Sequence, residues 1–555
     1  MDIWAIMKHI GIVECISTGR LYVNDIIAKG FRPLIINTMD ATEHCIDYRR
    51  IISAELEGKV DFIDEEEDFD SFVEKLKGYD LEYVFPGSER GVRLADRIIA
   101  ALGLIGNDEK TTYLRCTKEG MFEALGKANI RRINTAMVGC EEDLIKFWDE
   151  NDLEKVVLKF SESASTVGLK ICGSKEEAID HLKKMLVMPD SRGKINSKVL
   201  AQEYIGGTEY IVNTLSCNGK HMLTDIWVYS KIRSDDGTLA YDYAKLVKDL
   251  EPGHTDMIRY AYKVLDAVEM KWGLCHIEIK IDRKGPVLIE TNARPMGLGM
   301  TAAYLDEALG HHYTDIALDV YMHPDHFDQY AMKRYAPLKY ALMKTMIVPE
   351  DIVGSFAPTF VISNMVRSTR ELLYFGKEGV GNYPRTIDLN TSPLAIKMIN
   401  KDYGALMRDY ELLRLIESNY FHLFYTLSDN IEASEPKTDL DTLIKILDPI
   451  RRFLLVTNDG NYLVQYGKKS EMDRWMIFDG AIYAKCTAST TEDRYVSIYR
   501  TMHSIRSGGA FIVVPEAYEN MKDGSVIMDF LMNIAGFQIM APSYNSAGIM
   551  YGVKQ

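Results

Sequence analysis

The first hundred residues alternate short apolar runs with segments of helical spacing. Apolar runs of buried-strand length occupy residues 10–16, Arg32–Asn37 and 81–85, and the polar–apolar spacing predicts helices over 21–29 and 91–102. Strands that alternate with helices indicate a parallel sheet covered on both faces. Gly19 follows the first strand and suits a phosphate-binding turn, but the absence of a GxGxxG pattern argues against a dinucleotide site there.

The pattern changes after residue 110. Residues 110–325 contain hairpin-like strand pairs separated by helices, which is typical of an α+β region, and residues 335–427 are mixed. Residues 428–438 are polar and contain a proline, as linkers do, and beyond them apolar strands are predicted at 453–456 and 510–514. The chain is therefore predicted to have four regions: 1–110, 111–330, 331–427 and an accessory α/β domain over 439–555.

Composition narrows the class of protein. Among 555 residues, 47% are hydrophobic and 26% charged, as in soluble globular proteins. The net charge of −16 argues against a general nucleic-acid or anionic-membrane binder, since both need a basic surface. No stretch has the ~18 apolar residues of a membrane span, and no basic segment precedes the first apolar residues as in a signal peptide. The eight cysteines lack CxxC spacing, so we expect a cytoplasmic protein.

A lysine at a strand end is the first candidate for chemistry. The predicted strand Val156–Lys159 is followed by a loop rich in small hydroxyl residues, including Ser163, Ser165 and Thr166. An ammonium group offsets phosphate charge, while loop N–H and O–H groups bond phosphate oxygens, so the segment suits a polyphosphate. A solvated lysine before a flexible loop is the alternative.

Two glutamates flank a glycine turn further along the chain. The predicted strand 199–204 is followed by Gly206, Gly207 and a second strand, so the segment is expected to be a hairpin. Glu203 and Glu209 would then lie at the same end of this hairpin and flank a ligand with polar edges, such as an adenosine. Two solvated glutamates are again the alternative.

The most informative segment has two strands joined by a short charged turn, at 273–280 and 285–294. Glu290 and Asn292 are two positions apart and so point to one face of their strand, which Glu278 on the neighbouring strand can reach. Two carboxylates and an amide oxygen form an all-oxygen set that suits Mg²⁺ and does not suit zinc. Arg294 continues the same face, where its guanidinium could hold a phosphate or an oxyanion.

Taken in order, these segments resemble the ATP-grasp superfamily. The resemblance also rests on residues 10–20 (IGIVECISTGR), 87–96 (GSERGVRLAD), 102–107 (LGLIGN) and 224–231 (TDIWVYSK). Within this superfamily, the sequence most resembles the carboxylate–amine ligases that include bacilysin synthetase and carnosine synthase. The resemblance implies α/β and α+β architecture, in which an ATP-grasp fold follows a Rossmann-like N-terminal domain and precedes a C-terminal α/β extension.

The same resemblance implies how ATP is bound. Lys118 and Lys159 would contact the nucleotide phosphates. Glu203 and the Ile205 backbone would hold the adenine edge, and Glu209 would hold the ribose hydroxyls.

It also implies the metal and catalytic residues. Glu278, Glu290 and Asn292 would bind two Mg²⁺ ions, with Mn²⁺ as an alternative, and Arg294 would stabilise an acyl phosphate or tetrahedral intermediate. Three further residues are candidates for the substrate end: Glu89, Lys231 and His276. Because its neighbours are apolar, His276 also fits a packed histidine behind the metal ligands.

Three positions depart from the family pattern. Thr117 stands where an aspartate often precedes the first lysine, Phe160 where a proline often follows the second, and the phosphate loop has only Gly168, with Ser165 in place of another glycine. A loop with more Cβ atoms approaches phosphate less closely. These departures put the loop geometry and turnover in question, but not the fold.

The function expected from the resemblance is the ATP-dependent joining of a carboxylate, such as an amino acid, to an amine. Two alternatives stay open: another ATP-grasp ligase, acting on a nucleotide precursor or a carrier-bound acyl group, and an ATP-binding sensor or scaffold without turnover. We expect small-molecule substrates, no nucleic-acid or membrane partner, and a homodimer.

Overall fold

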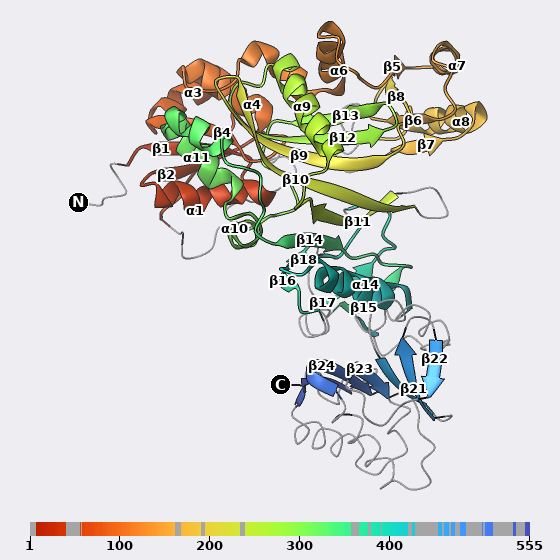
Figure 1. Cartoon of the computed structure of the whole chain (residues 1–555). Helices are drawn as coiled ribbons and strands as arrows, with labels where there is room; N and C mark the ends of the chain where they lie inside the picture. Colours follow the sequence, from red (N-terminus) through yellow and green to blue (C-terminus); the bar gives the residue numbers. More distant parts are fainter. Residues whose placement is uncertain are drawn as a thin grey trace. The chain divides into compact units, whose positions relative to one another are not determined.

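The structure is a computed structural model of the whole chain (Figure 1). It describes residues 7–39, 56, 58–160, 168–189, 195–233, 239–356, 366–375, 379–389, 391–419, 425–427, 453–457, 460–465, 468–471, 478–483, 502, 505–513, 537–539 and 550–554. The chain divides into two compact units, Met1–Leu342 and Met343–Gln555. The predicted polar linker 428–438 lies outside the described residues, as does Val514 at the end of the last predicted strand.

The first unit begins with the predicted parallel sheet. Its four strands run in the order β3-β2-β1-β4, which are Asp61–Asp64, Arg32–Asn37, His9–Val13 and Leu81–Pro86. Its helices are α1 (Leu21–Ala28), α3 (Phe69–Lys77) and α4 (Val92–Leu102), with apolar faces buried on the strands. The Rossmann-like prediction is therefore confirmed. Gly19 lies in a 3₁₀ turn, η2 (Ser17–Arg20), and a Cβ added there would lie 2.2 Å from the Gly87 carbonyl oxygen.

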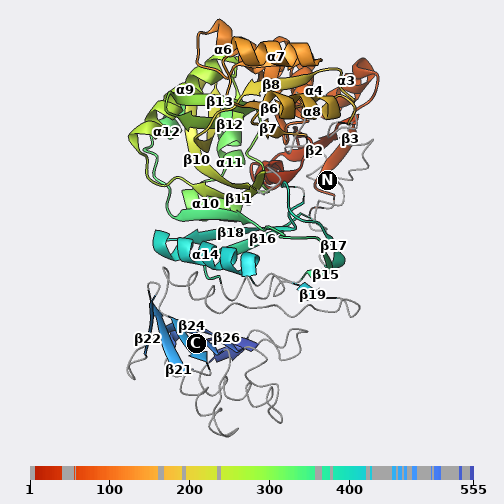
Figure 2. The same cartoon turned by 90° about the vertical axis from the view of Figure 1, so that its right-hand side faces the viewer.

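A small antiparallel sheet follows the N-terminal domain. Its strands run in the order β5-β8-β6-β7, which are Thr135–Val138, Val199–Glu203, Val156–Lys159 and Lys170–Cys172. Helices α7 (Glu141–Glu150) and α8 (Lys175–Met185) pack on it and bury a separate apolar cluster. This subdomain therefore has its own core, and its helices and strands lie together in Figure 2.

A larger antiparallel sheet carries most of the candidate site. Within the first unit its strands run in the order β13-β12-β9-β10-β11, which are Gly285–Asn292, Gly273–Asp282, Thr208–Cys217, Lys220–Arg233 and Leu239–Leu246. Helix α9 (Pro252–Ala267) lies along β12 and β13, with α6 (Lys118–Lys127) beside it (Figure 1). Cys275, Ile277 and Ile279 of β12 face this helical layer, so the alternate residues face the other way.

The expected hairpin around the two glycines is wrong. Strands β8 and β9 belong to different sheets and do not pair. The chain instead crosses from the small sheet to the large one at Gly206 and Gly207. Gly207 has a φ of +90°, and a Cβ there would lie 2.1 Å from the Ile281 carbonyl oxygen, so the crossing needs glycine.

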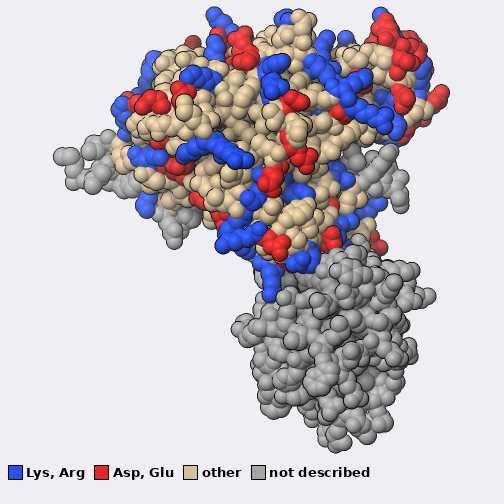
Figure 3. Space-filling view, viewed as in Figure 1, with Lys and Arg blue, Asp and Glu red and all other residues tan. Residues whose placement is uncertain are grey.

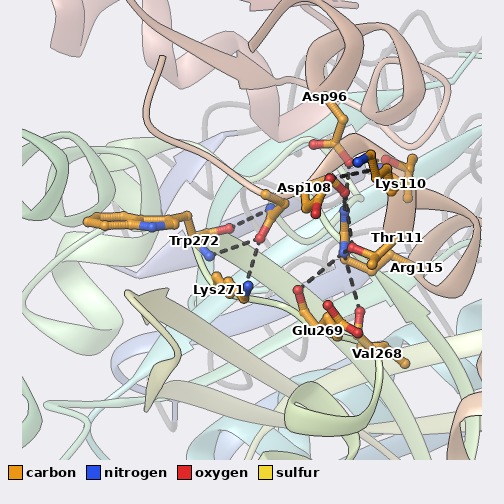
Figure 4. Close-up of polar contacts among 11 residues, drawn as sticks. Asp96, Asp108, Lys110, Thr111, Arg115, Val268, Glu269, Lys271 and Trp272 are labelled. Atoms are coloured by element: carbon orange, nitrogen blue, oxygen red, sulfur yellow. Dashed lines mark hydrogen bonds and ion pairs between the residues drawn. The ribbon is translucent and has the colours of Figure 1, made fainter. Parts of the chain in front are cut away.

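A buried arginine joins the N-terminal domain to the turn before β12. Arg115, in α5 (Thr112–Cys116), bonds the Asp96 carboxylate at 2.9 Å and the carbonyls of Val268 and Glu269 at 3.3 and 3.2 Å (Figure 4). The Asn107 side chain adds bonds to the backbone of residues 271 and 272. Because β12 starts at residue 273, these contacts fix the start of the strand that carries Glu278.

The remaining helices of the first unit follow β13. They are α10 (Ala302–Leu309), α11 (Tyr313–Met322) and α12 (Phe327–Ala331). Helix α11 packs against α1 of the N-terminal domain. None of the helices in the described part of the chain is long and apolar enough to cross a membrane. On the face shown in Figure 3, basic and acidic side chains are interspersed.

The described part of the second unit contributes strands to three sheets. Strands β14 (Tyr340–Thr345), β18 (Leu394–Asn400) and β16 (Thr369–Tyr374) follow one another in one sheet, with α14 (Tyr403–Asn419) packed against β18. A second sheet pairs β17 (Gly379–Tyr383), β15 (Ile352–Phe356) and β19 (Tyr425–Leu427). The last sheet runs in the order β22-β21-β20-β23-β24-β26-β25, which are Lys468–Glu471, Gly460–Gln465, Phe453–Thr457, Phe478–Tyr483, Ile505–Val513, Met550–Lys554 and Phe537–Ile539. The strands predicted at 453–456 and 510–514 correspond to β20 and β24.

Candidate active site

Two carboxylates and a lysine meet at one end of the large sheet. Glu278 of β12 and Glu290 of β13 are direct cross-strand partners, beside a register shift in the ladder. The Lys118 Nζ lies 3.0 Å from Glu290 Oε2. Lys118 is buried and begins α6, which Thr117 caps by accepting a hydrogen bond from the Gly120 N–H at 3.0 Å. The threonine at this departure from the family pattern therefore has a structural role.

The two carboxylates hold protons differently. Burial acts to raise the pKa of Glu290, but the Lys118 and Lys159 charges and a hydrogen bond from Lys118 outweigh it and lower the pKa. Burial and the neighbouring Glu290 charge raise the pKa of Glu278. Two full negative charges in direct opposition are costly, so the pair favours a cation nearby.

The Asn292 amide brings a third carboxylate into the group. One of its two outer atoms faces Glu290 Oε1 at 3.3 Å and Glu89 Oε2 at 3.1 Å. If this atom is the nitrogen, the amide donates to both carboxylates; if it is the oxygen, three oxygens converge and need a cation among them. Desolvation by the neighbouring groups and the Glu290 charge raise the pKa of Glu89, although the residue is exposed to solvent.

This donor set fits a hard divalent cation. In the described residues, no three His, Cys, Asp or Glu side chains form a metal-binding group by themselves. A metal site at Glu278 and Glu290 would therefore also draw on the amide oxygen of Asn292, turned toward the cation. Carboxylate and amide oxygens are the ligands that suit Mg²⁺ or Mn²⁺.

Arg294 and His276 border the same group. Arg294 lies two residues beyond the end of β13, its Nη1 donates to the Pro295 carbonyl at 3.0 Å, and its charge acts to lower the pKa of Glu89 and Glu278. The Nε2 of His276 lies 3.5 Å from Glu278 Oε1, and the ring is 3% exposed. Burial, followed by the Arg294 charge, lowers the pKa of His276 well below its ordinary value. The ring is therefore neutral.

The small sheet contributes Lys159, the last residue of β6. Burial, followed by the Lys118 charge, lowers the pKa of Lys159 to about 8. The predicted loop residues Ser163, Ser165 and Thr166 lie outside the described residues. Phe160 is buried in the core of the small sheet, and a Cβ added to Gly168 (φ +71°) would lie 2.7 Å from the Phe160 ring. The phenylalanine and the glycine thus fit together where the loop rejoins the sheet.

The predicted adenosine residues lie around the crossing between the sheets. Glu203 ends β8, and the Ile205 carbonyl accepts a hydrogen bond from Lys280 Nζ at 3.0 Å. Glu209 Oε1 accepts one from Lys231 Nζ at 2.7 Å, and Lys280 Nζ lies 4.0 Å from Glu209 Oε2. Lys231 therefore joins the predicted ribose residue, and its charge also acts to lower the pKa of Glu278.

Sequence reasoning missed Lys280 and two residues behind His276. Lys280 lies two positions after Glu278, so the alternation His-Ile-Glu-Ile-Lys already predicts that it faces the site. Asn213 and Asp225 reach His276 only through the pairing of β12, β9 and β10, which no local pattern reveals.

Comparisons with known proteins identify similar sequences and folds. A family model described as an ATP-grasp domain matches residues 154–302, a range that includes β6, the sheet crossing, β12, β13 and Arg294. The chain is 27% identical over 359 residues to dapdiamide A synthase of Enterobacter agglomerans, covering 64% of this chain and 83% of that protein.

Solved structures show the same fold. An L-amino acid ligase from Bacillus licheniformis aligns with a TM-score of 0.58 at 15% identity and covers 73% of this chain and 97% of that one. A carboxyaminoimidazole ribonucleotide synthase from Aspergillus clavatus, solved with ATP, has a TM-score of 0.54 at 13% identity and covers 75% and 99%. The ATP-grasp fold predicted from the sequence is therefore confirmed.

Proposed function

We propose that this protein, in which residues 154–302 match an ATP-grasp domain, is an ATP-dependent ligase that joins the carboxylate of an amino acid to an amine. The observation that carries the proposal is the convergence of Lys118, Glu278, Glu290 and Asn292 at one end of the large sheet, with Arg294 beside them. The similarity to a dapdiamide synthase and to an L-amino acid ligase supports the same chemistry.

The reaction has two steps. A carboxylate oxygen of the first substrate attacks the γ-phosphorus of ATP, the bond to the β–γ bridging oxygen breaks, and an acyl phosphate and ADP form. The amine nitrogen of the second substrate then attacks the acyl carbon, phosphate leaves, and the amine gives up a proton as the amide forms. Both steps build negative charge on oxygen atoms, which the site must stabilise.

The basic residues meet the charge on the phosphates. Lys159 at the end of β6 and Lys118 at the start of α6 would neutralise phosphate oxygens, and each acts on the pKa of Glu290, so they lie near one another. Arg294 would hold the acyl phosphate or tetrahedral oxyanion with its guanidinium fork. Arg294 lies two residues beyond β13, where its charge acts on the pKa of both Glu89 and Glu278.

The acidic residues would hold the metal. Glu278, Glu290 and Asn292 are the proposed ligands of Mg²⁺, or of Mn²⁺ in its place. When bound, the cation supplies charge neutralisation for the phosphate oxygens. Until then Lys118 balances the charge of Glu290.

The nucleoside would bind at the sheet crossing. The Ile205 backbone and Glu203 would hold the adenine edge, and Glu209 would accept hydrogen bonds from the ribose hydroxyls. Lys280 already bonds the Ile205 carbonyl, so it would keep this part of the crossing in place for adenine. At the substrate end, Glu89 and Lys231 carry opposite charges, which match the ammonium and carboxylate of an amino acid.

The test is ADP release from the full chain with ATP, Mg²⁺ and pairs of amino acids, followed by mass spectrometry of the products. We expect one amide per ADP for at least one pair. ADP formed only with nucleotide precursors or carrier-bound acyl groups would favour another ATP-grasp ligase. ATP binding without turnover on any of these substrates would favour a sensor or scaffold.

A further inference from the structure

A row of four polar side chains crosses the large sheet behind the candidate active site. Asn292 of β13, His276 of β12, Asn213 of β9 and Asp225 of β10 are successive cross-strand partners. All four are buried, between 0% and 4% exposed. Polar groups at this depth are hydrogen-bonded in stable proteins, so the row must have a definite arrangement of donors and acceptors.

Asp225 fixes one end of the row. Its carboxylate is 0% exposed and accepts four hydrogen bonds from neutral donors. The donors are Trp227 Nε1 at 2.5 Å, Asn213 Nδ2 at 2.7 Å, Thr224 Oγ1 at 2.9 Å and Tyr313 O–H at 3.2 Å. Because an indole nitrogen can only donate, the Asp225 Oδ1 that it meets is an acceptor.

The arrangement continues through Asn213 to the histidine. The amide nitrogen of Asn213 faces Asp225, so its oxygen faces His276 Nδ1, at 3.1 Å. An amide oxygen only accepts, so Nδ1 must carry the hydrogen. A neutral imidazole has one N–H, and Nε2 therefore carries a lone pair, which lies 3.5 Å from Glu278 Oε1.

We propose that Asn213 and Asp225 are positioning residues that hold His276 as its Nδ1–H tautomer, so that the Nε2 lone pair and the Glu278 carboxylate face each other at the metal end of the sheet. With the opposite tautomer, Nε2–H would donate to Glu278 and offset part of its charge. With the Nδ1–H tautomer, Nε2 donates no hydrogen bond to Glu278, and two acceptors in opposition favour a cation nearby. The consequence for metal binding rests on the proposed function; the tautomer does not.

The tautomer can be measured directly. The full chain is labelled with ¹⁵N-histidine, and the His276 ring signals are assigned by their loss in His276→Gln. We expect a protonated Nδ1 and an unprotonated Nε2 in the unchanged protein, and a protonated Nε2 there overturns the proposal. If a variant described below does not fold, this measurement still decides.

Asn213→Leu is the test variant, because leucine has a similar shape and removes both hydrogen bonds. Nδ1 then loses its acceptor while Nε2 keeps Glu278, so the ring should change to the Nε2–H tautomer. Thr214→Val is the matched control, since Thr214 is the next residue, is equally buried and points to the opposite face of β9. An unchanged tautomer in folded Asn213→Leu overturns the role of Asn213.

Asp225→Asn tests whether the row needs the negative charge of Asp225 or only its hydrogen-bond acceptor. Its amide can keep an oxygen toward Trp227 and Asn213 and turn its nitrogen toward Thr224 Oγ1, so the Nδ1–H tautomer should persist. Asp225→Leu removes the acceptor and should change the tautomer as Asn213→Leu does. The opposite pattern in these two variants overturns the role of Asp225.

Metal binding supplies the functional readout. Electron paramagnetic resonance of Mn²⁺ with the ADP-bound chain should show affinity about tenfold to a hundredfold weaker in Asn213→Leu and unchanged in Thr214→Val. An inverted tautomer with unchanged Mn²⁺ affinity would overturn the consequence for the metal. If the protein has the Nδ1–H tautomer but forms no amide, the proposed function is wrong and the inference about the tautomer still holds.

Discussion

The Lys118 ammonium lies 3.0 Å from the carboxylate of Glu290, which is also a proposed metal ligand. Both side chains are largely removed from solvent, at 8% and 19% exposed, so their attraction is weakly screened. The lysine raises the energetic cost of metal binding in the absence of nucleotide, because the metal must displace or face a like charge. Nucleotide phosphates offer Lys118 another partner, so nucleotide and metal should bind together.

The first prediction tests this exchange. Lys118→Met should bind Mn²⁺ without nucleotide about tenfold or more tightly than the unchanged protein, because a competing charge is removed. The same variant should turn over ATP more slowly, since it loses a phosphate contact. Electron paramagnetic resonance measures free Mn²⁺, and Lys339→Met, which breaks a 2.9 Å pair with Glu307, is the matched control. Equal Mn²⁺ affinity in Lys118→Met and the unchanged protein would contradict the exchange.

The second prediction concerns Glu290 itself. Glu290→Gln should reduce ATP turnover by roughly a hundredfold or more while the protein stays folded, because an amide cannot supply the ligand charge. The nearby Glu89 charge still favours protonated Lys118 in this variant. ADP release and thermal unfolding are measured together, and Glu307→Gln serves as the control. Unchanged turnover in the folded variant would remove Glu290 from the site.

Local pattern predicted the strands well and their pairing less well. Arg32–Asn37 and Val156–Lys159 have the predicted bounds, because an apolar run between polar turns is a local property. The sequence predicted that Glu278 reaches the face of Glu290. Their direct opposition was not predictable, because it depends on a register shift beside Glu278 that the turn alone does not produce. The hairpin predicted at Gly206 and Gly207 was wrong. Two glycines permit either a tight turn or a crossing between sheets, and only long-range packing decides between them.

The row of polar side chains behind the site could not be predicted from the sequence. Asn213 and Asp225 are 63 and 51 residues from His276, and they meet it through the register of three strands, one of which carries a bulge. A shift by one residue would turn each side chain to the other face. Sequence spacing alone therefore could not place them together.

The third prediction uses the pKa of Lys159, which burial and Lys118 lower to about 8. A bound phosphate favours the charged lysine, so its pKa rises on binding, and affinity must fall as the pH rises through the value of the free protein. ADP should bind about tenfold more weakly at pH 9 than at pH 7. Lys159→Arg should bind equally at both values, because arginine stays charged.

Calorimetry at constant Mg²⁺ makes the measurement, and Lys159→Ala should raise KM for ATP and lower kcat together. Lys175→Ala on α8, which removes an exposed ion pair with Asp149, is the control and should keep the pH dependence of the unchanged protein. A pH-independent affinity in the unchanged protein would place Lys159 away from the phosphates.

The fourth prediction concerns His312, which links the N-terminal domain to α10 and α11. Its Nε2 lies 3.1 Å from Asp25 and its Nδ1 2.8 Å from Asp306. Burial acts to lower the pKa of His312, but hydrogen bonds and charges from both aspartates outweigh it and raise the pKa from 6.5 to about 9. The resulting stabilisation is complete below about pH 6.5 and is lost as the pH rises through about 9.

Thermal unfolding of His312→Gln against the unchanged protein should therefore differ most at pH 6. We expect about 1–2 kcal/mol there, less than the full shift implies because Asp306 is open to solvent. His181 is the contrasting control: burial lowers its pKa, so its effect on stability should arise only below about pH 6.5. A stability difference for His312→Gln that grows toward pH 9 would contradict the ion pairs.

The fifth prediction concerns the C-terminal region 439–555, which we expect to be an independently compact accessory domain. A truncation should end at Leu427, because β19 (Tyr425–Leu427) pairs residue by residue with Gly354–Phe356 of β15, and an earlier cut would expose that strand edge. The shortened chain should stay soluble and keep its ligase activity within about twofold, since every proposed site residue precedes residue 295 and surface changes away from a site have small effects. Activity assays and gel filtration compare it with the full chain, and cutting after Gly354, which removes β19 and most of its pairing partner, is the destabilised control.

An insoluble product ending at Leu427 would mean that apolar strands beyond it complete the core of residues 343–427. A soluble product with much lower activity would instead assign the C-terminal region a part in catalysis.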